Sequence, residues 1–340
     1  MRKPDYNQLL KVLNKQVPDR PTLFEFFLNQ PLYKVLANGE APVKGDGFDP
    51  MREQIFAYKN AGYDYVTIMA STFSFPTLDK AHKSTISLND GGTISDWASY
   101  ESYKWPDPAS FDNETIINKA MEVLPEGMKL IVYGPGGVLE NVIALVGYDS
   151  LCLMLYDNPE LVGKLFDDVG SRLLDYYKLH VERESVCAII SNDDWGFKTQ
   201  TMLSPDDMRK YVFPWHKKIV AAAHKYNKPV ILHSCGQLGD VMDDIIDDMA
   251  YDAKHSYEDT ILPVEQAYEK YKRRIAIMGG LDVDFVCRSS TEDVAKRAQA
   301  MLERAAKDGG YALGTGNSVP EYVPHAQYMA MVGVIRGSVK

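Results

Sequence analysis

The run ILHSCGQ (231–237) places a histidine and a cysteine two residues apart at the end of an apolar segment. Side chains alternate between the two faces of a strand, so in a strand His233 and Cys235 project from the same face. Imidazole and thiolate are both good ligands of tetrahedral Zn²⁺. The spacing therefore allows one metal ion to bind both residues, and Gly236 leaves room for the chain to turn. The alternative is a buried thiol beside a hydrogen-bonded histidine, because free cysteine often packs as a small hydrophobe.

Other apolar runs also end in polar side chains, which are Asp194, His255, Glu258, Asp282 and Asn317. Asp194, His255 and Asp282 are candidates for orienting ligands or handling protons. Glu258 and Asn317 are candidates for substrate binding. Acidic residues at strand ends are also common N-caps of the next helix, so each of them has a structural alternative.

Aromatic residues near the strand ends are candidates for the wall of an apolar pocket. These are Phe73, Phe75 and Trp195. Pockets for small molecules are lined mainly by apolar and aromatic side chains. The alternative for each ring is packing in the core.

Eight short apolar runs carry these residues and must position them, and each run is followed by a helical pattern. The runs cover residues 21–27, 63–70, 129–135, 186–193, 229–235, 251–257, 275–282 and 311–317. Near-continuous apolar runs are typical of strands buried on both faces, as in parallel sheets. Eight successive strand-then-helix units predict an α/β fold of the (β/α)₈ TIM-barrel type, with one domain over 1–340 and the site at the C-terminal ends of the strands.

Two helices have clear start signals. The segment 204–226 begins with Ser204 as N-cap and Pro205 at the first position, and Ser290 or Thr291 begins another that ends at Gly309 and Gly310. The segment 84–100 has two alternating runs around Asn-Asp-Gly-Gly, which predicts a β-hairpin inserted after the second strand.

Composition excludes several classes of protein. The 340 residues are 45% hydrophobic and 25% charged, with a net charge of -10, which argues against nucleic acid or an anionic membrane as the main partner. No apolar stretch is long enough for a transmembrane helix, and the N-terminus lacks the apolar segment of a signal peptide. The four cysteines are far apart and do not form a disulfide framework, so we expect a reducing cytoplasm.

Longer stretches of the chain resemble a known family. They include YGPGG (133–137), the segment 203–236 that ends in ILHSCG, IAIMGGLDV (275–283) and GGYALGTGN (309–317). They are similar to the uroporphyrinogen decarboxylase superfamily, which contains porphyrinogen decarboxylases and zinc-dependent corrinoid methyltransferases. The resemblance covers nearly the whole chain and implies a (β/α)₈ barrel.

The chain departs from the decarboxylases of this superfamily after the first run. Those enzymes bind substrate carboxylates through an Arg-rich segment, whereas this chain has no arginine from Pro21 to Met51. A tetrapyrrole with many carboxylates would meet Glu25 there instead of a guanidinium fork, which disfavours porphyrinogen decarboxylation.

The methyltransferases are similar at the H-x-C motif, and this resemblance implies that His233 and Cys235 hold Zn²⁺. The third family ligand is a cysteine after a glycine on the last strand, and here that position is Asn317. Either His255, Glu258 or Asp282 replaces it, or the site is weak or empty.

The resemblance therefore implies a methyltransferase, which we expect in the cytoplasm, that moves a methyl group between a small molecule and a corrinoid, either free cobalamin or a corrinoid protein. Decarboxylation of a porphyrinogen-like acid and non-catalytic binding of a corrinoid are the alternatives.

Overall fold

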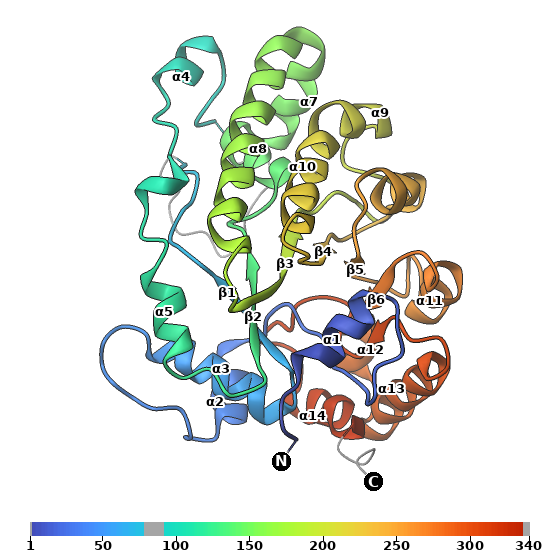
Figure 1. Cartoon of the computed structure of the whole chain (residues 1–340). Helices are drawn as coiled ribbons and strands as arrows, with labels where there is room; N and C mark the ends of the chain where they lie inside the picture. Colours follow the sequence, from blue (N-terminus) through green and yellow to red (C-terminus); the bar gives the residue numbers. More distant parts are fainter. Residues whose placement is uncertain (1, 78–91, 336–340) are drawn as a thin grey trace.

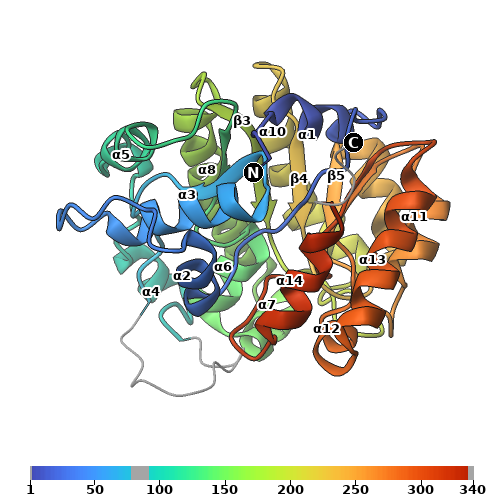
Figure 2. The ribbon, with the colours of Figure 1, turned by 90° about the horizontal axis from the view of Figure 1, so that it is seen from below.

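A computed structural model describes residues 2–77 and 92–335 (Figure 1). Seven strands form one parallel sheet in sequence order. They are β1 (Tyr65–Met69), β2 (Lys129–Tyr133), β3 (Val186–Asn192), β4 (Val230–His233), β5 (Ala253–His255), β6 (Ala276–Met278) and β7 (Tyr311–Ala312). Each strand lies within one of the predicted runs, and the sheet is curled, with helices around it (Figure 2), as in a TIM-barrel-like α/β fold.

The first apolar run, 21–27, is the exception, because it forms only an isolated parallel bridge from Leu23 to Leu313. On its other side it meets hydroxyl groups from β1. The Tyr65 hydroxyl bonds both the N–H and the carbonyl of Glu25, at 2.7 and 2.8 Å, and Thr67 donates to the carbonyl of Phe26 at 2.6 Å. Side-chain hydroxyls thus take the place of a backbone ladder, and seven regular strands are found where eight were predicted.

Helices fill the connections between strands. They are α1 (Tyr6–Leu13), α2 (Gln30–Ala37), α3 (Asp49–Ala61), α4 (Trp97–Ser102), α5 (Thr115–Met121), α6 (Val138–Val146), α7 (Tyr148–Asp157), α8 (Pro159–Val181), α9 (Pro205–Asp207), α10 (Phe213–His224), α11 (Val264–Tyr271), α12 (Val283–Arg288), α13 (Thr291–Ala305) and α14 (His325–Gly333). Among the described helices, no single one is long and apolar enough to cross a membrane, although the bent pair α6–α7 meets that test jointly, with 93° between its two members.

The predicted start signals are confirmed at two helices. Ser204 accepts a hydrogen bond from the N–H of Asp207, and Ser290 accepts one from the N–H of Asp293. The segment after Ser204 is not one regular helix, however. A π-helical turn, Met208–Val212, separates α9 from α10, and Pro214 follows it closely. Proline has no N–H to donate to the preceding turn, which accounts for the looser winding.

The predicted hairpin over 84–100 is not confirmed. Residues 84–91 lie outside the described residues. In the rest of the segment Trp97 begins α4, where Asp96 and Ser99 form a capping box. The second arm therefore ends in a helix, since a reciprocal cap at the N-terminus outweighs the alternating pattern.

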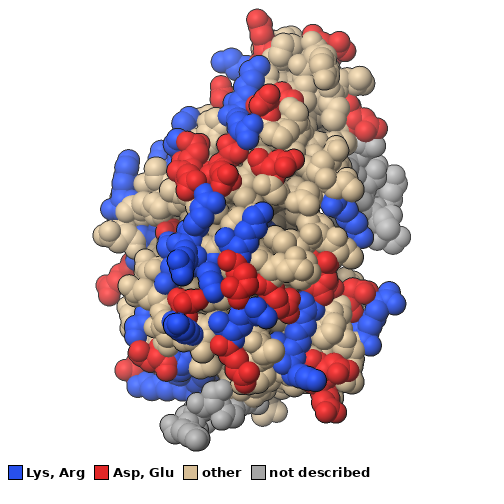
Figure 3. Space-filling model, turned by 90° about the vertical axis from the view of Figure 1, so that its right-hand side faces the viewer, with Lys and Arg blue, Asp and Glu red and all other residues tan. Residues whose placement is uncertain are grey.

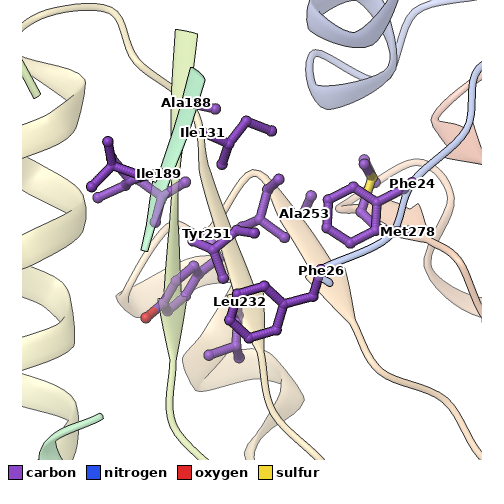
Figure 4. Packing of buried hydrophobic residues seen from close by; sticks show 14 of the residues in the cluster. Phe24, Phe26, Ile131, Ala188, Ile189, Leu232, Tyr251, Ala253 and Met278 are labelled. Atoms are coloured by element: carbon purple, nitrogen blue, oxygen red, sulfur yellow. The ribbon is translucent and has the colours of Figure 1, made fainter. Parts of the chain in front are cut away.

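Side chains that point inward fill the space enclosed by the curled sheet. Figure 4 shows Phe24, Ile131, Ala253 and Met278 directed into the space between strands, and all four are buried. This apolar layer supports the residues above it at the C-terminal ends of the strands.

Candidate metal site and cleft

A cleft of about 790 Å³ opens at the C-terminal ends of the strands. Its floor includes the last residues of four neighbouring strands, which are Met69, Tyr133, Asn192 and His233. Strand register pairs Met69 with Tyr133 and Asn192 with His233, so these side chains lie next to one another across the sheet. The cleft therefore lies at the end of the sheet where the sequence predicted the site.

Three potential metal ligands meet on this floor. Ligand atoms of Asp194, His233 and Cys235 all lie within 4.8 Å of one another. A carboxylate, an imidazole and a thiolate are the donor types that zinc accepts, and three protein ligands leave its fourth position open. The residues present thus fit a zinc ion with room for one exogenous ligand. Asp194 offers the third potential ligand, whereas the sequence had suggested His255, Glu258 or Asp282 for that position and Asp194 for orienting ligands or handling protons.

The loops after β3 and β4 bring Asp194 and Cys235 together. The N–H of Cys235 donates to Asp194 at 2.9 Å, and the N–H of Trp195 donates to the hydroxyl of Ser234 at 3.2 Å. Gly236 has φ +85°, and a Cβ there would lie 2.2 Å from the backbone of Gly196. Only glycine permits this close approach, so Gly236 does more than allow the chain to turn.

Hydrogen bonds fix the tautomer of His233. The carbonyl of Thr315 lies 3.1 Å from Nε2 of His255, and a carbonyl only accepts, so Nε2 of His255 carries the proton. Nδ1 of His255 then accepts from Nδ1 of His233, at 2.8 Å. This leaves Nε2 of His233 with a free lone pair. Burial also lowers the pKa of His233 to about 3, so the imidazole is neutral and ready to bind a metal.

The surroundings of Cys235 disfavour its thiolate form. Burial, with the nearby Asp194 carboxylate, raises the pKa of its thiol to about 12 in the absence of a metal. Two groups donate to its sulfur, Ser256 at 3.5 Å and the amide of Asn317 at 3.3 Å. The N–H of Ser318 donates to Oδ1 of Asn317 at 2.7 Å, which turns the amide nitrogen toward Cys235. Asn317 thus faces the cluster as a donor to a ligand.

We therefore expect Asn317→Cys to add a sulfur ligand. Zn²⁺ affinity, measured by chelator competition, should rise, most of all at alkaline pH, because the new thiol must lose a proton to bind. X-ray absorption should count two sulfur neighbours instead of one. Asn317→Ala is the matched control, and loss of its N–H donor should weaken zinc binding by about tenfold. One sulfur and unchanged affinity in the cysteine variant would mean that position 317 does not reach the metal.

The other predicted polar residues have different surroundings. His255 is buried behind His233 and acts on it, not on the cleft. Asp282 lines the cleft, but its two oxygens accept from the N–H groups of Phe285 and Asp259, at 3.0 and 2.8 Å, so it serves as the N-cap of α12. Glu258 lines the cleft and is half-buried.

The predicted aromatic residues do not form the cleft wall. Phe73 is fully buried and packs against Phe75 and Tyr176, and Trp195 is fully buried against Phe213. Both belong to the core, which was the stated alternative. Among the described residues the aromatic wall consists of Phe26, Phe27, Tyr133, Tyr257 and Tyr322. Whether an aromatic ring lines the cleft or lies in the core depends on which helices cover the end of its strand.

The structure also corrects the prediction that a substrate meets Glu25. This residue is fully buried, and its carboxyl group is hydrogen-bonded to the N–H and to the hydroxyl of Thr315, both at 2.7 Å. A substrate in the cleft therefore does not meet Glu25. It meets Phe26 and Phe27, which line the cleft.

Sequence reasoning missed Glu140, which lines the cleft from α6. Its carboxylate accepts from the N–H of Gly137 at 2.9 Å. Burial, together with Asp193 and Asp194, raises the pKa of Glu140 to about 8, in the range of a proton donor at neutral pH. The available signal was its place three residues after Gly137, the position of a capping-box glutamate.

No lysine or arginine lines the cleft among the residues that the structure describes. Its acidic lining consists of five carboxyl groups, those of Glu140, Asp194, Glu258, Asp282 and Asp284. Recognition of a polycarboxylate usually relies on guanidinium or ammonium groups. The charge of the cleft opposes such a substrate.

Comparison with known proteins places the chain in a family. The model of the uroporphyrinogen decarboxylase (URO-D) family matches residues 91–338. The chain belongs to the URO-D family. Among curated members, uroporphyrinogen decarboxylase of Myxococcus xanthus is 25% identical over 177 residues, 52% of this chain and 48% of that protein. That of Geobacter metallireducens is 25% identical over 183 residues, 53% and 50% of the two chains. The matches thus span about half the length of these URO-D relatives.

A solved structure shares the fold over the whole chain. It is a methyltransferase from Methanosarcina mazei, with a TM-score of 0.72 and 15% identity, and the alignment covers 99% of each chain. At this identity the likeness concerns the fold. The URO-D family member described here thus shares its overall fold with that protein.

Proposed function

We propose that this protein is a zinc-dependent methyltransferase that moves a methyl group between a small molecule and a corrinoid, either free cobalamin or a corrinoid protein in the cytoplasm. In this proposal residues 1–340 form one (β/α)₈ barrel, in which the run 21–27 takes the place of the eighth strand. The observation that carries it is the cluster of Asp194, His233 and Cys235 at the floor of the cleft.

Each ligand has its own support. Nε2 of His233 is free because His255 holds Nδ1. Asp194 accepts from the N–H of Cys235, which orients the carboxylate. Zn²⁺ bound there supplies a Lewis acid that polarises or deprotonates a substrate heteroatom. Glu140, with its pKa near 8, is the residue best placed in the cleft to hold or release a proton.

Decarboxylation is the second candidate, because the curated relatives are uroporphyrinogen decarboxylases. The acidic lining of the cleft speaks against it. The cluster of potential metal ligands also favours methyl transfer. Binding of substrate carboxylates relies on basic side chains and does not require a metal site.

Two assays on the same preparation test the proposal. Zinc-loaded protein is expected to catalyse demethylation of methylcobalamin or methylation of cob(I)alamin with a suitable small molecule, and His233→Ala is expected to abolish the reaction. Enzymatically generated uroporphyrinogen should remain intact, as judged by chromatography of the oxidised products. Partly decarboxylated porphyrins, or zinc-independent activity, would refute the methyltransferase.

A further inference from the structure

We propose that the cleft selects a small organic cation with an ammonium head group as its substrate. This inference rests on the proposed function for the identity of the site, and it adds the chemical class of the small molecule. Its starting point is the lining, in which five acids are present and the described residues include no lysine or arginine.

A bound zinc ion would not cancel this negative charge. Asp194 and Cys235 bring two negative charges as ligands, and these balance the two positive charges of Zn²⁺, while His233 binds as a neutral imidazole. The loaded cluster is then close to neutral. Glu140, described above as a proton donor, adds no charge while it holds its proton. The other carboxylates outside the cluster, above all Glu258, still set the sign of the potential that an incoming molecule meets.

Glu258 is the carboxylate best placed to meet a ligand. It lines the cleft, is half-buried, and its carboxylate has no hydrogen bond or ion pair to any residue in 2–77 or 92–335. A buried basic side chain, Lys254, interacts electrostatically with Glu258 but makes no ion pair with it, because it donates to the carbonyls of Ser234 and Ser256, at 3.3 and 2.6 Å. Its ammonium group lies 4.4 Å from the ring centre of Tyr257, so it is held behind the wall of the cleft. A partly buried carboxylate without a partner calls for a positively charged or donating ligand.

Aromatic side chains line the same space. Phe26, Phe27 and Tyr133 pack as neighbours, with ring centres 4.9 and 5.0 Å from that of Phe26. The faces of such rings attract cations, and quaternary ammonium groups are bound in this way. The ring of Tyr257 lines the cleft as well, whereas its hydroxyl oxygen is buried.

The acidic character of the cleft lining is not simply a result of the net charge of -10. On the face shown in Figure 3, acidic and basic side chains are interspersed, as on an ordinary protein surface. Asp284, at the mouth of the cleft, pairs with Arg288 at 2.6 Å, so its charge is offset. The exclusion of basic side chains is a property of the interior of the cleft.

Two probes of the same shape test the inference directly. Choline carries a trimethylammonium group, and neohexanol replaces its nitrogen with carbon and has no charge. Calorimetry on zinc-loaded protein should show choline binding about tenfold more tightly than neohexanol, the scale of one charge-assisted contact. Glu258→Gln should remove most of this preference and leave neohexanol binding unchanged. Glu292→Gln, the same change at an exposed position of α13, is the control and should have no effect.

The outcomes separate this inference from the proposed function. Equal affinity for the two probes, or tighter binding of the anion tert-butylacetate, overturns the cationic substrate even if zinc and methyl transfer are found. A preference for choline that depends on Glu258 supports the inference, and it does so even in protein that binds no zinc, where only the proposed function fails. A preference that Glu292→Gln abolishes as well would reflect net charge alone and would also overturn it.

Discussion

Replacement of Cys235 by serine is expected to lower the affinity for Zn²⁺ by at least about a hundredfold, because a hydroxyl is a far weaker zinc ligand than a thiolate. His233→Ala should have a similar effect, and Asp194→Asn a smaller one, because an amide oxygen still reaches the metal without its charge. Wild-type protein purified without chelator should carry about one zinc per chain. Metal analysis and chelator competition measure both quantities.

The fold should survive these changes, which makes the result easy to interpret. The apolar layer beneath the cleft does not include the ligands, and Cys235 is partly exposed to the cleft. Circular dichroism and thermal unfolding of each variant should therefore resemble those of the metal-free wild type. The substitution Cys187→Ser is a matched control, because Cys187 is buried in the core at the start of β3, whereas the cluster lies beyond the C-terminal ends of the strands. Full zinc retention in the His233 and Cys235 variants would end the proposal.

Glu25→Gln is expected to remove a large part of the pH dependence of stability. Burial raises the pKa of Glu25 to about 8, although the hydrogen bonds from Thr315 oppose the shift. Geometry agrees with a protonated acid. The single proton of the Thr315 hydroxyl is shared between Glu25 at 2.7 Å and the carbonyl of Asn317 at 2.5 Å. That carbonyl can only accept, so both bonds form when Glu25 supplies a proton of its own.

The sign of the effect follows from proton binding. Between the ordinary value of 4.5 and about 8, the folded protein keeps a proton on Glu25 that the unfolded chain has released. The free energy of unfolding must then fall as the pH rises through this window, by up to about 5 kcal/mol for this group. Glutamine preserves the pattern, because its amide donates to the Thr315 hydroxyl and its oxygen accepts from the N–H.

Denaturant unfolding at several pH values measures this difference. From pH 5 to pH 8 the wild type should lose stability more steeply than Glu25→Gln, so that the variant gains relative to the wild type as the pH rises. Glu292→Gln should run parallel to the wild type, since Glu292 is exposed. Parallel curves for Glu25→Gln and the wild type would show that Glu25 is ionised in the folded state.

Much of the fold was predictable because its signals are local. Seven predicted runs contain strands, and Ser204 and Ser290 begin helices, because apolar patterning and caps act over a few residues. The first run and the segment 84–100 were harder. Whether a run forms a ladder depends on its neighbour, and hydroxyls of Tyr65 and Thr67 on β1 replaced the ladder at 21–27.

At the candidate site, the period of two predicted that His233 and Cys235 share a face, but β4 ends at His233 and the loop after it carries Cys235 to the cluster. Only the tertiary structure brought Asp194 to them, because it depends on β3 and β4 being neighbours and on the contact between Gly196 and Gly236. The same holds for Glu25, which the sequence placed before a substrate and the structure buries against Thr315. Residue types and spacing specify what a side chain can bind, but the partners it meets are set by the order of strands and by the helices that cover them.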